Sequence, residues 1–277
     1  MRARAGNARL IRRLGVQQST MYRWLAGARM GKTNIGWTEA TWNPVTGCSR
    51  VSPGCEHCYA ESLSLRMGWS AKPWTNQNAT ANVKTHHDRV NQPLSWRTPR
   101  RVFVNSMSDM FHPLVPDSFL NKCFAVMAQA NRHTFQILTK RPERMLDYCE
   151  KRRVGLPLPN VWLGVSCEDQ RRADERIPLL LETPAAVRFV SLEPLLGPID
   201  FPLPCDGSVF WGGLHWGIIG GESGPQYRPM QVEWAQGIAD TFAWAHVPLY
   251  VKQDSGPRPG KQGRLSDALW ARKEFPK

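Results

Sequence analysis

Three cysteines stand close together in the first quarter of the chain. Cys48, Cys55 and Cys58 have the spacing C-x6-C-x2-C, and a Pro-Gly pair between them supplies a tight turn. Three thiolates on one loop can hold three irons of a cubane [4Fe–4S] cluster, and the fourth iron stays open to a substrate or cofactor. Backbone N–H groups of such a loop can donate to cluster sulfides and tune its potential. This cysteine loop (residues 48–58) therefore predicts an iron–sulfur centre.

Zinc is the main alternative ligand for the same loop. It would be held by the three cysteines with His57 or a distant fourth ligand. Structural zinc sites usually combine two C-x2-C units, or one C-x2-C unit with two histidines, and no second pair is present. His57 lies between two ligands, where it is poorly placed to chelate the same ion. Plain buried cysteines are a third interpretation, which three cysteines within eleven residues argue against.

The other four cysteines are scattered, and the chain holds seven in all. An odd number without an export signal argues against a disulfide framework. These four bystanders are Cys123, Cys149, Cys167 and Cys205.

Short apolar runs alternate with longer amphipathic stretches along most of the chain. This alternation predicts a parallel sheet of about six to seven strands with helical crossovers. An open doubly wound sheet and a full or partial (β/α) barrel both fit, and no GxGxxG follows the first strand, which weakens a Rossmann interpretation. The expected strands are 42–45, 101–106, 134–139, 160–166, 186–192, 216–220 and 248–252, and the expected helices are 116–131, 141–153, 169–183 and 232–245.

Polar residues recur where the predicted strands end. In parallel α/β folds and barrels this edge binds ligands, although polar residues there also cap the following helices. Six such ends favour a ligand site. They are residues 105–109, 139–141, 166–169, 191–194, 220–224 and 252–254.

A three-cysteine loop after the first strand resembles the radical S-adenosylmethionine (SAM) superfamily. The usual spacing there is C-x3-C-x2-C with an aromatic residue before the last cysteine, whereas here the first gap is longer and His57 replaces the aromatic. A closer resemblance is to a phage and prophage family of three-cysteine proteins, the gene-product thirty-seven/sixty-eight family. It covers roughly residues 33–277 and is carried by the runs 35–48, 104–112, 138–142, 163–166, 193–197 and 220–224.

The resemblance implies a partial (β/α) barrel of the radical-SAM type with two cofactors, a [4Fe–4S] cluster and SAM. The three cysteines would hold the cluster, and its open iron would chelate the amino and carboxylate groups of SAM. One electron, from a donor such as flavodoxin or ferredoxin, would cleave the sulfonium and yield a 5′-deoxyadenosyl radical that abstracts hydrogen from a substrate. The protein's own share would be positioning, electrostatics and exclusion of water.

Within this interpretation, side-chain chemistry suggests which residues hold the charged ends of SAM. The ammonium needs carboxylate or hydroxyl acceptors, which Ser106, Ser108 and Asp109 supply after the second predicted strand. The carboxylate needs a cation, for which Lys140 or Arg141 is the candidate. For any one of these residues, a helix cap or a rim salt bridge is the competing interpretation.

The remaining strand ends supply groups for the rest of SAM and for the substrate. Ser166 and Glu168 suit the ribose hydroxyls, and Gly220 and Gly221 allow close backbone approach to the adenine or methionine moiety. The residues left for the substrate, which we predict to be catalytic, are Glu193, Glu222 and Lys252.

The net charge of +13 suggests a polyanionic partner, often nucleic acid. Residues 1–29 hold seven of the 36 basic side chains and no acidic one, so about a tenth of the chain supplies more than half of the excess. We predict a basic N-terminal extension over 1–29, disordered or helix-turn-helix-like, and a radical-SAM-like catalytic domain over 30–277. Residues 252–277 are also basic, with seven basic and three acidic side chains.

No window of eighteen apolar residues and no secretory signal is present, which predicts a cytoplasmic protein without a membrane partner. The sequence thus predicts a radical SAM enzyme acting on a nucleic acid or nucleotide. The first alternative is a zinc-stabilised nucleic-acid-binding protein without redox activity. The second is a scaffold protein that carries a redox-silent cluster.

Overall fold

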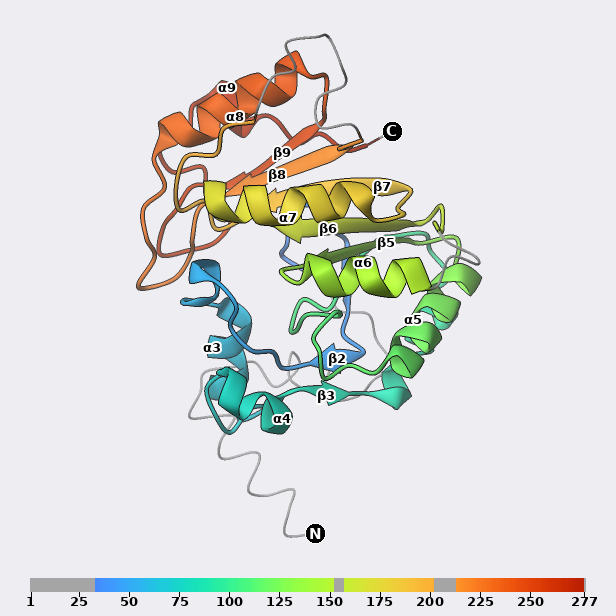
Figure 1. Cartoon of the computed structure of the whole chain (residues 1–277). Helices are drawn as coiled ribbons and strands as arrows, with labels where there is room; N and C mark the ends of the chain where they lie inside the picture. Colours follow the sequence, from blue (N-terminus) through green and yellow to red (C-terminus); the bar gives the residue numbers. More distant parts are fainter. Residues whose placement is uncertain (1–32, 152–156, 202–212, 277) are drawn as a thin grey trace.

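The computed structural model describes residues 33–151, 157–201 and 213–276 (Figure 1). The predicted N-terminal extension over 1–29 and Cys205 lie outside the described residues. No helix in the described part of the chain is long and apolar enough to cross a membrane.

Seven parallel strands form the main sheet, and their order in space is their order in the sequence. Every connection therefore advances in the same direction, as in a (β/α) barrel, whereas the strand order of a doubly wound sheet reverses at a switch point. The strands at the two ends of this order do not pair with each other, so the barrel is open and the predicted partial (β/α) barrel is confirmed. In order, the strands are β1 (Ala40–Trp42), β4 (Arg101–Val104), β5 (Thr134–Thr139), β6 (Val161–Ser166), β7 (Val187–Leu192), β8 (Trp216–Gly220) and β9 (Leu249–Gln253).

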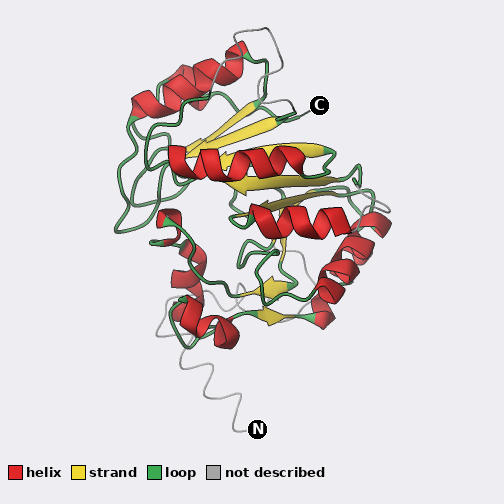
Figure 2. Cartoon of the chain, viewed as in Figure 1, coloured by secondary structure: helices red, strands yellow, loops and turns green. Residues whose placement is uncertain are grey.

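Four longer helices connect these strands and cover one face of the sheet (Figure 2). Their apolar stripes pack on the strands; on α5, for example, Phe119, Phe124 and Met127 are all buried. The other face of the sheet carries a separate aromatic cluster that includes Trp37, Phe189 and Trp216. Both faces of the strands are therefore buried, as their continuous apolar runs predict. The four helices are α5 (Asp117–Gln129), α6 (Pro142–Lys151), α7 (Gln170–Glu182) and α8 (Val232–Trp244).

The predicted first strand over 42–45 is wrong in its bounds. The chain leaves the main sheet after Trp42, because Pro44 has no N–H with which to continue the ladder. The next two residues form β2 (Val45–Thr46), which pairs antiparallel with β3 (Lys84–Thr85) in a small second sheet. The strand predicted over 101–106 also ends early, since Asn105 has a left-handed backbone with φ 62°.

The segment between β1 and β4 holds the cysteine loop and several short helices. Figure 1 shows it beside the sheet, with α3 on the side where the loops after β8 and β9 also lie. The short elements here are η1 (Pro53–Cys55), α3 (Tyr59–Arg66), η2 (Asn76–Asn78), α4 (Ala79–Asn82), η3 (His87–Arg89) and η4 (Gln92–Ser95), and α9 (Asp267–Trp270) follows the last strand.

Candidate metal centre and adjoining cavity

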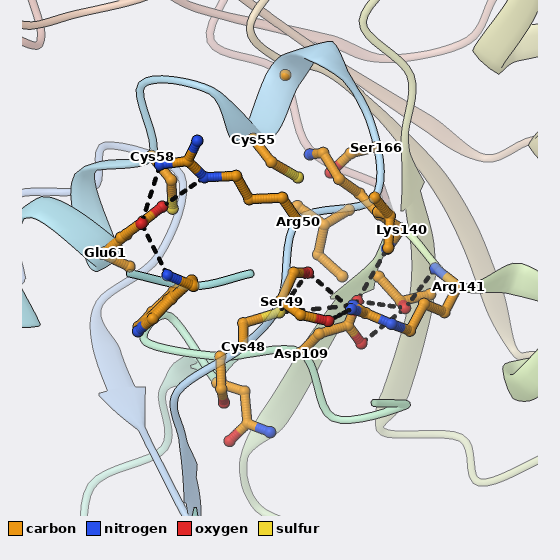
Figure 3. A pocket seen from close by; sticks show the side chains of 18 of the residues that line it. Cys48, Ser49, Arg50, Cys55, Cys58, Glu61, Asp109, Lys140, Arg141 and Ser166 are labelled. Carbon is orange, nitrogen blue, oxygen red and sulfur yellow. Dashed lines mark hydrogen bonds and ion pairs between the residues drawn. The ribbon is translucent and has the colours of Figure 1, made fainter. Parts of the chain in front are cut away.

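The structure brings the three clustered cysteines to one cavity of about 170 Å³. Cys48, Cys55 and Cys58 are partly buried free thiols, and Figure 3 shows them reaching the cavity from different sides. The other lining residues include Ser106, after the end of β4, and Lys140, after the end of β5. The cavity therefore lies at the carboxyl edge of the parallel strands, where the sequence predicts a ligand site.

Cys48 has a cationic donor against its sulfur. The Nη1 of Arg141 lies 3.5 Å from Cys48 Sγ and donates to it, while Nη2 donates to the carbonyl oxygen of Ser49 at 2.8 Å. Burial raises the pKa of Cys48 to about 12, and the charge of Arg141 acts in the opposite direction. Arg141 therefore favours the thiolate form that a metal requires.

The other two sulfurs have donors of their own. Cys58 is the N-cap residue of α3, and the backbone N–H groups of Ala60 and Glu61 lie against its sulfur. These two N–H groups oppose the burial that raises the pKa of the Cys58 thiol. Ser52 Oγ lies 3.9 Å from Cys55 Sγ. Each of the three sulfurs thus has a polar partner from the chain, as ligating thiolates usually do.

The arrangement of the donors fits a cluster of several irons. In the described part of the chain, no three His, Cys, Asp or Glu side chains gather closely enough to hold a single metal ion. The sulfurs instead stand around a cavity, and a cubane is wider than one ion. Asn105 also lines this cavity, and its buried Nδ2 has no hydrogen-bond partner among the described residues. Three cysteine sulfurs around one cavity fit a thiolate-held cluster better than a single ion.

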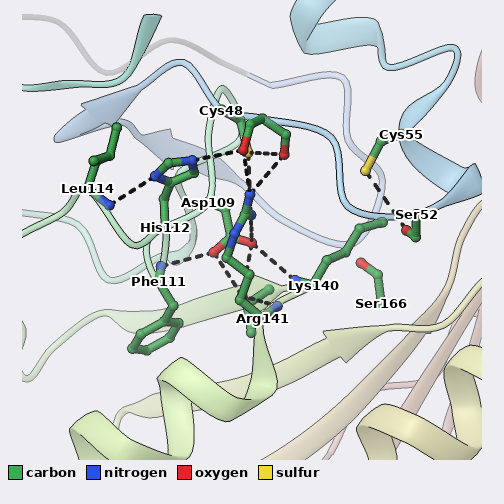
Figure 4. A network of polar contacts seen from close by, with 12 residues as sticks. Cys48, Ser52, Cys55, Asp109, Phe111, His112, Leu114, Lys140, Arg141 and Ser166 are labelled. Atoms are coloured by element: carbon green, nitrogen blue, oxygen red, sulfur yellow. Dashed lines mark hydrogen bonds and ion pairs between the residues drawn. The ribbon is translucent and has the colours of Figure 1, made fainter. Parts of the chain in front are cut away.

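Asp109 lines this cavity, and its carboxylate is held by several neighbouring residues (Figure 4). Its carboxylate accepts hydrogen bonds from Thr139 Oγ1 at 2.8 Å, from the Lys140 N–H at 3.1 Å and from Arg141 Nη1 at 2.9 Å. The N–H of Phe111 is a further donor at 2.9 Å. Both oxygens therefore accept hydrogen bonds from neighbouring residues, one of which is Arg141.

Glu168 fastens the cysteine loop to the end of β6. It is fully buried, forms an ion pair with Arg176 Nη1 at 3.0 Å and accepts the N–H of Gly54 at 3.3 Å. Burial opposes its ionisation, but Lys140 and Arg176 outweigh that effect and lower the pKa of the carboxyl group. A Cβ atom on Gly54 would lie 3.1 Å from Glu168 Cδ and 3.3 Å from Pro194 Cδ, so glycine allows this close approach.

A second fastening joins the cysteine loop to the end of β8. Glu222 accepts hydrogen bonds from Arg228 Nη2 at 2.6 Å and from His57 Nδ1 at 3.0 Å. Arg228 also reaches the loop itself, donating to Glu56 Oε2 at 2.9 Å and to the Pro53 carbonyl at 3.0 Å. Burial works against ionisation of Glu222, but these donors outweigh it and lower its pKa to about 2.

Arg228 and Arg176 are site residues that the sequence did not reveal. Arg228 is separated from Glu56 by 172 positions, and no local pattern distinguishes it from other surface arginines. Arg176 lies within α7, eight positions after Glu168, which is a spacing that helix periodicity alone does not single out.

A second cavity of about 200 Å³ adjoins the first one. Tyr59, Lys140 and Ser166 line both, so the two cavities share a wall. Across the second cavity, Glu193 and Lys252 form an ion pair at 2.8 Å. The predicted catalytic residues Glu193, Glu222 and Lys252 thus line one cavity beside the three cysteines. Its apolar and aromatic lining consists of Ile35, Trp37, Tyr59, Phe103 and Leu138.

Lys140 and Ser166 keep polar groups available to a ligand. The Lys140 ammonium makes no hydrogen bond or ion pair with a described residue, and neither does the Ser166 hydroxyl. Two other predicted SAM ligands are already engaged: Ser106 Oγ pairs with the side chain of Asn43, and Ser108 Oγ donates to the Val45 carbonyl at 2.8 Å.

The two predicted glycines are required by the protein's own packing. A Cβ atom on Gly220 would lie 2.4 Å from Glu193 Oε1, and one on Gly221 would lie 2.2 Å from the Ser255 nitrogen. Only Gly221 of the two lines the second cavity. The close approaches seen at these glycines are therefore to other parts of the chain.

A family model described as "Protein of unknown function (DUF5131)" matches residues 32–269. The comparison with curated proteins gives no match. Two solved structures of spore photoproduct lyase are similar, one a mutant with bound AdoMet and dinucleoside spore photoproduct, the other complexed with dinucleoside spore photoproduct. Both have a TM-score of 0.44 and 12% sequence identity, and they cover 87% and 78% of this chain. The chain spans less than two thirds of their length, 61% and 64%.

Proposed function

The chain belongs to the DUF5131 family, and we propose that it is a radical SAM enzyme with a [4Fe–4S] cluster on Cys48, Cys55 and Cys58. The observation that carries the proposal is the convergence of these three cysteines on one cavity, each with a polar partner, next to a second cavity. A cluster bound there supplies an electron and an open iron for the cleavage of SAM. The chain's residues supply binding, orientation and a site shielded from water.

Lys140 and Ser166 are the residues that we propose for SAM. Both line the wall shared by the two cavities, and the Lys140 ammonium and the Ser166 hydroxyl make no hydrogen bond or ion pair with a described residue. The ammonium of Lys140 suits the SAM carboxylate, since a charge-assisted hydrogen bond is stronger than a neutral one. The hydroxyl of Ser166 suits the ribose. Asp109 acts indirectly, because it holds Arg141 against Cys48.

The second cavity is the proposed place for the substrate, a nucleic acid or nucleotide. Its aromatic lining, which includes Trp37 and Phe103, offers a surface for a flat ring, and the Glu193–Lys252 pair offers a hydrogen-bond acceptor and donor at its wall. Either charge can be released to a substrate group, which places a proton donor or acceptor beside the reacting unit. Flavodoxin or ferredoxin is the proposed electron donor.

The test is anaerobic reconstitution of the full chain with iron and sulfide, followed by reduction with dithionite in the presence of SAM. We expect a brown protein that forms 5′-deoxyadenosine, and C48S, C55S and C58S should each lose the colour. C123A is the matched control, because Cys123 is buried on α5 away from both cavities.

Two results would contradict the proposal. A colourless protein with one stoichiometric zinc would support the zinc-stabilised nucleic-acid-binding protein instead. A brown protein that binds SAM without forming 5′-deoxyadenosine under any reductant would support the scaffold with a redox-silent cluster.

A further inference from the structure

An exposed basic segment lies next to residues that line the second cavity. Residues 255–264 contain three basic side chains, Arg258, Lys261 and Arg264, and no acidic one. Arg258 and Lys261 are exposed and make no hydrogen bond or ion pair with a described residue, whereas Arg264 pairs with Asp254 at 2.8 Å. The structure therefore leaves two cations at this place to solvent or to a partner.

The segment is fixed against residues that line the cavity. The N–H of Gly260 donates to Gln253 Oε1 at 2.9 Å, and the N–H of Gly256 donates to the Glu222 carbonyl at 3.0 Å. Gln253 and Glu222 both line the second cavity. The N–H of Asp254 donates to the carbonyl oxygen of Lys261 at 2.9 Å. Hydrogen bonds at Gly256, Gly260 and Lys261 thus hold the segment next to residues that line the cavity.

An exposed aromatic side chain completes this surface. Tyr227 is 38% exposed and lies close enough to Arg264 to interact with it electrostatically. Its own loop, which follows β8, is bound to the basic segment because Arg264 Nη2 donates to the Met230 carbonyl and Met230 N–H donates to Ser255 Oγ at 2.8 Å. We call Tyr227, Arg258, Lys261 and Arg264 the basic rim.

We propose that the basic rim binds the phosphate backbone of a single-stranded nucleic acid whose target nucleotide enters the second cavity. Binding of the phosphate backbone is inferred from the basic rim alone. Entry of the target nucleotide into the second cavity rests on the proposed function. A cavity of about 200 Å³ holds one nucleotide-sized unit, so cations outside it can only meet the phosphates on either side of that unit. Tyr227 offers a ring on which a flanking base stacks.

The single-stranded form follows from the geometry of the cavity. A base inside a duplex is stacked and paired, and an enzyme that acts on it must first extrude it into a pocket. The second cavity is lined by the cysteine loop and by residues at the ends of β7 to β9, and a base that enters it has left its stack and its pairing partner. We therefore infer that the substrate is a polymer with an unpaired target nucleotide, rather than a free nucleotide.

The experiment measures binding of a short, fluorescein-labelled single-stranded oligodeoxynucleotide by anisotropy over a series of salt concentrations. The full chain is used in every case, so the arginines of residues 1–29 contribute equally to all variants. The test variant is R258A/K261A. The matched control is R97A/R132A, which removes the same charge from exposed sites just before β4 and β5, at the opposite edge of the sheet.

R258A/K261A should lose two phosphate contacts to a single strand, which reduces the slope of log K against log salt by about 1.4. The control R97A/R132A should keep the wild-type slope. Y227A should weaken binding with no change of slope. Equal slopes for wild type, test and control variants would overturn the inference. Tighter binding of the rim to phosphatidylserine vesicles than to the oligonucleotide would also overturn it, and would point to a membrane surface.

Failure of this inference and failure of the proposed function are separable. Each variant is also reconstituted anaerobically, and its iron content and 5′-deoxyadenosine formation are measured without nucleic acid. A wild-type protein that forms 5′-deoxyadenosine but shows no rim-dependent binding contradicts the rim alone. A protein that binds through the rim but holds no cluster contradicts the proposed function alone.

Discussion

Arg141 places its Nη1 3.5 Å from the Sγ of Cys48 while the same nitrogen lies 2.9 Å from Asp109 Oδ2. The guanidinium and the carboxylate are both buried, so removal of either partner leaves an uncompensated charge. We predict that R141M lowers the free energy of unfolding by roughly 3 kcal/mol, the scale of a broken buried pair. It should also lower the iron content after reconstitution, because Cys48 loses its cationic donor.

Urea denaturation and iron analysis check this prediction. R141M/D109N should be less destabilised than the sum of the two single variants, since no buried charge is left alone. R171M removes an exposed arginine paired with Glu175 on α7 and should change little. Additive effects of R141M and D109N would contradict the coupling.

Glu222 should make the stability depend on pH in the acid range. Its folded pKa of about 2 lies below its ordinary value of 4.5, so the unfolded chain binds the proton first as the pH falls. The stabilisation is therefore complete above about pH 4.5 and is lost progressively as the pH falls toward about 2, by up to about 3 kcal/mol.

Urea titrations of the metal-free protein at several pH values measure this effect. E222Q should flatten the curve below pH 4.5, whereas E182Q, at an exposed residue near the end of α7, should leave it as in wild type. The same acid-dependent loss in E222Q and wild type would show that Glu222 is not the group responsible.

Substitution of Gly54 should disturb the cysteine loop without unfolding the barrel. In G54A the new methyl group would lie 3.1 Å from Glu168 Cδ, which is too close for a relaxed contact, and the loop must shift. We expect a several-fold faster loss of the cluster under air, with the far-ultraviolet circular dichroism unchanged.

The matched control is G237A on α8. Gly237 is an exposed helical residue whose added Cβ would meet nothing within 4 Å, so alanine should stabilise the protein by about 0.5–1 kcal/mol. Equal cluster lifetimes in G54A and G237A would mean that the contact with Glu168 does not constrain the loop.

Lys140 should contribute to the affinity for SAM. Loss of a charge-assisted hydrogen bond is worth about 1.5–3 kcal/mol, so K140M should bind SAM roughly ten to a hundred times more weakly. Equilibrium dialysis of the reconstituted protein measures this affinity. K122M removes an equal charge from the exposed side of α5 and should bind like wild type. An unchanged affinity in K140M would remove this residue from the SAM site.

Most of the fold could be predicted from the sequence, because buried strands and amphipathic helices carry their own periodicity. The strands Thr134–Thr139 and Trp216–Gly220 have the predicted bounds, and the helices agree within about two residues where the chain is described. The first strand could not be placed correctly, since the effect of Pro44 depends on which strand the chain would have to pair with next.

The site could be predicted only in part. The three cysteines are recognisable from their spacing, but the sequence does not show whether a carboxylate at a strand end faces a cavity or its own neighbours. The Asp109 carboxylate accepts hydrogen bonds from Thr139 and Arg141, and the Glu222 carboxylate accepts one from Arg228. These partners come from other strand ends, so only the folded sheet edge reveals them.

The hydrogen bonds between Arg228 and the cysteine loop also affect the order in which contacts form while the chain is being synthesised. The loop leaves the ribosome early. Glu56 can accept its hydrogen bond from Arg228 only after 172 further residues have been made. A nascent chain that has completed β1 to β7 holds the three cysteines on a loop with no tie to β8. A chain that ends before Arg228 therefore lacks the partner of Glu56 and of the Pro53 carbonyl, and its cysteine loop keeps the hydrogen bond from Gly54 to Glu168.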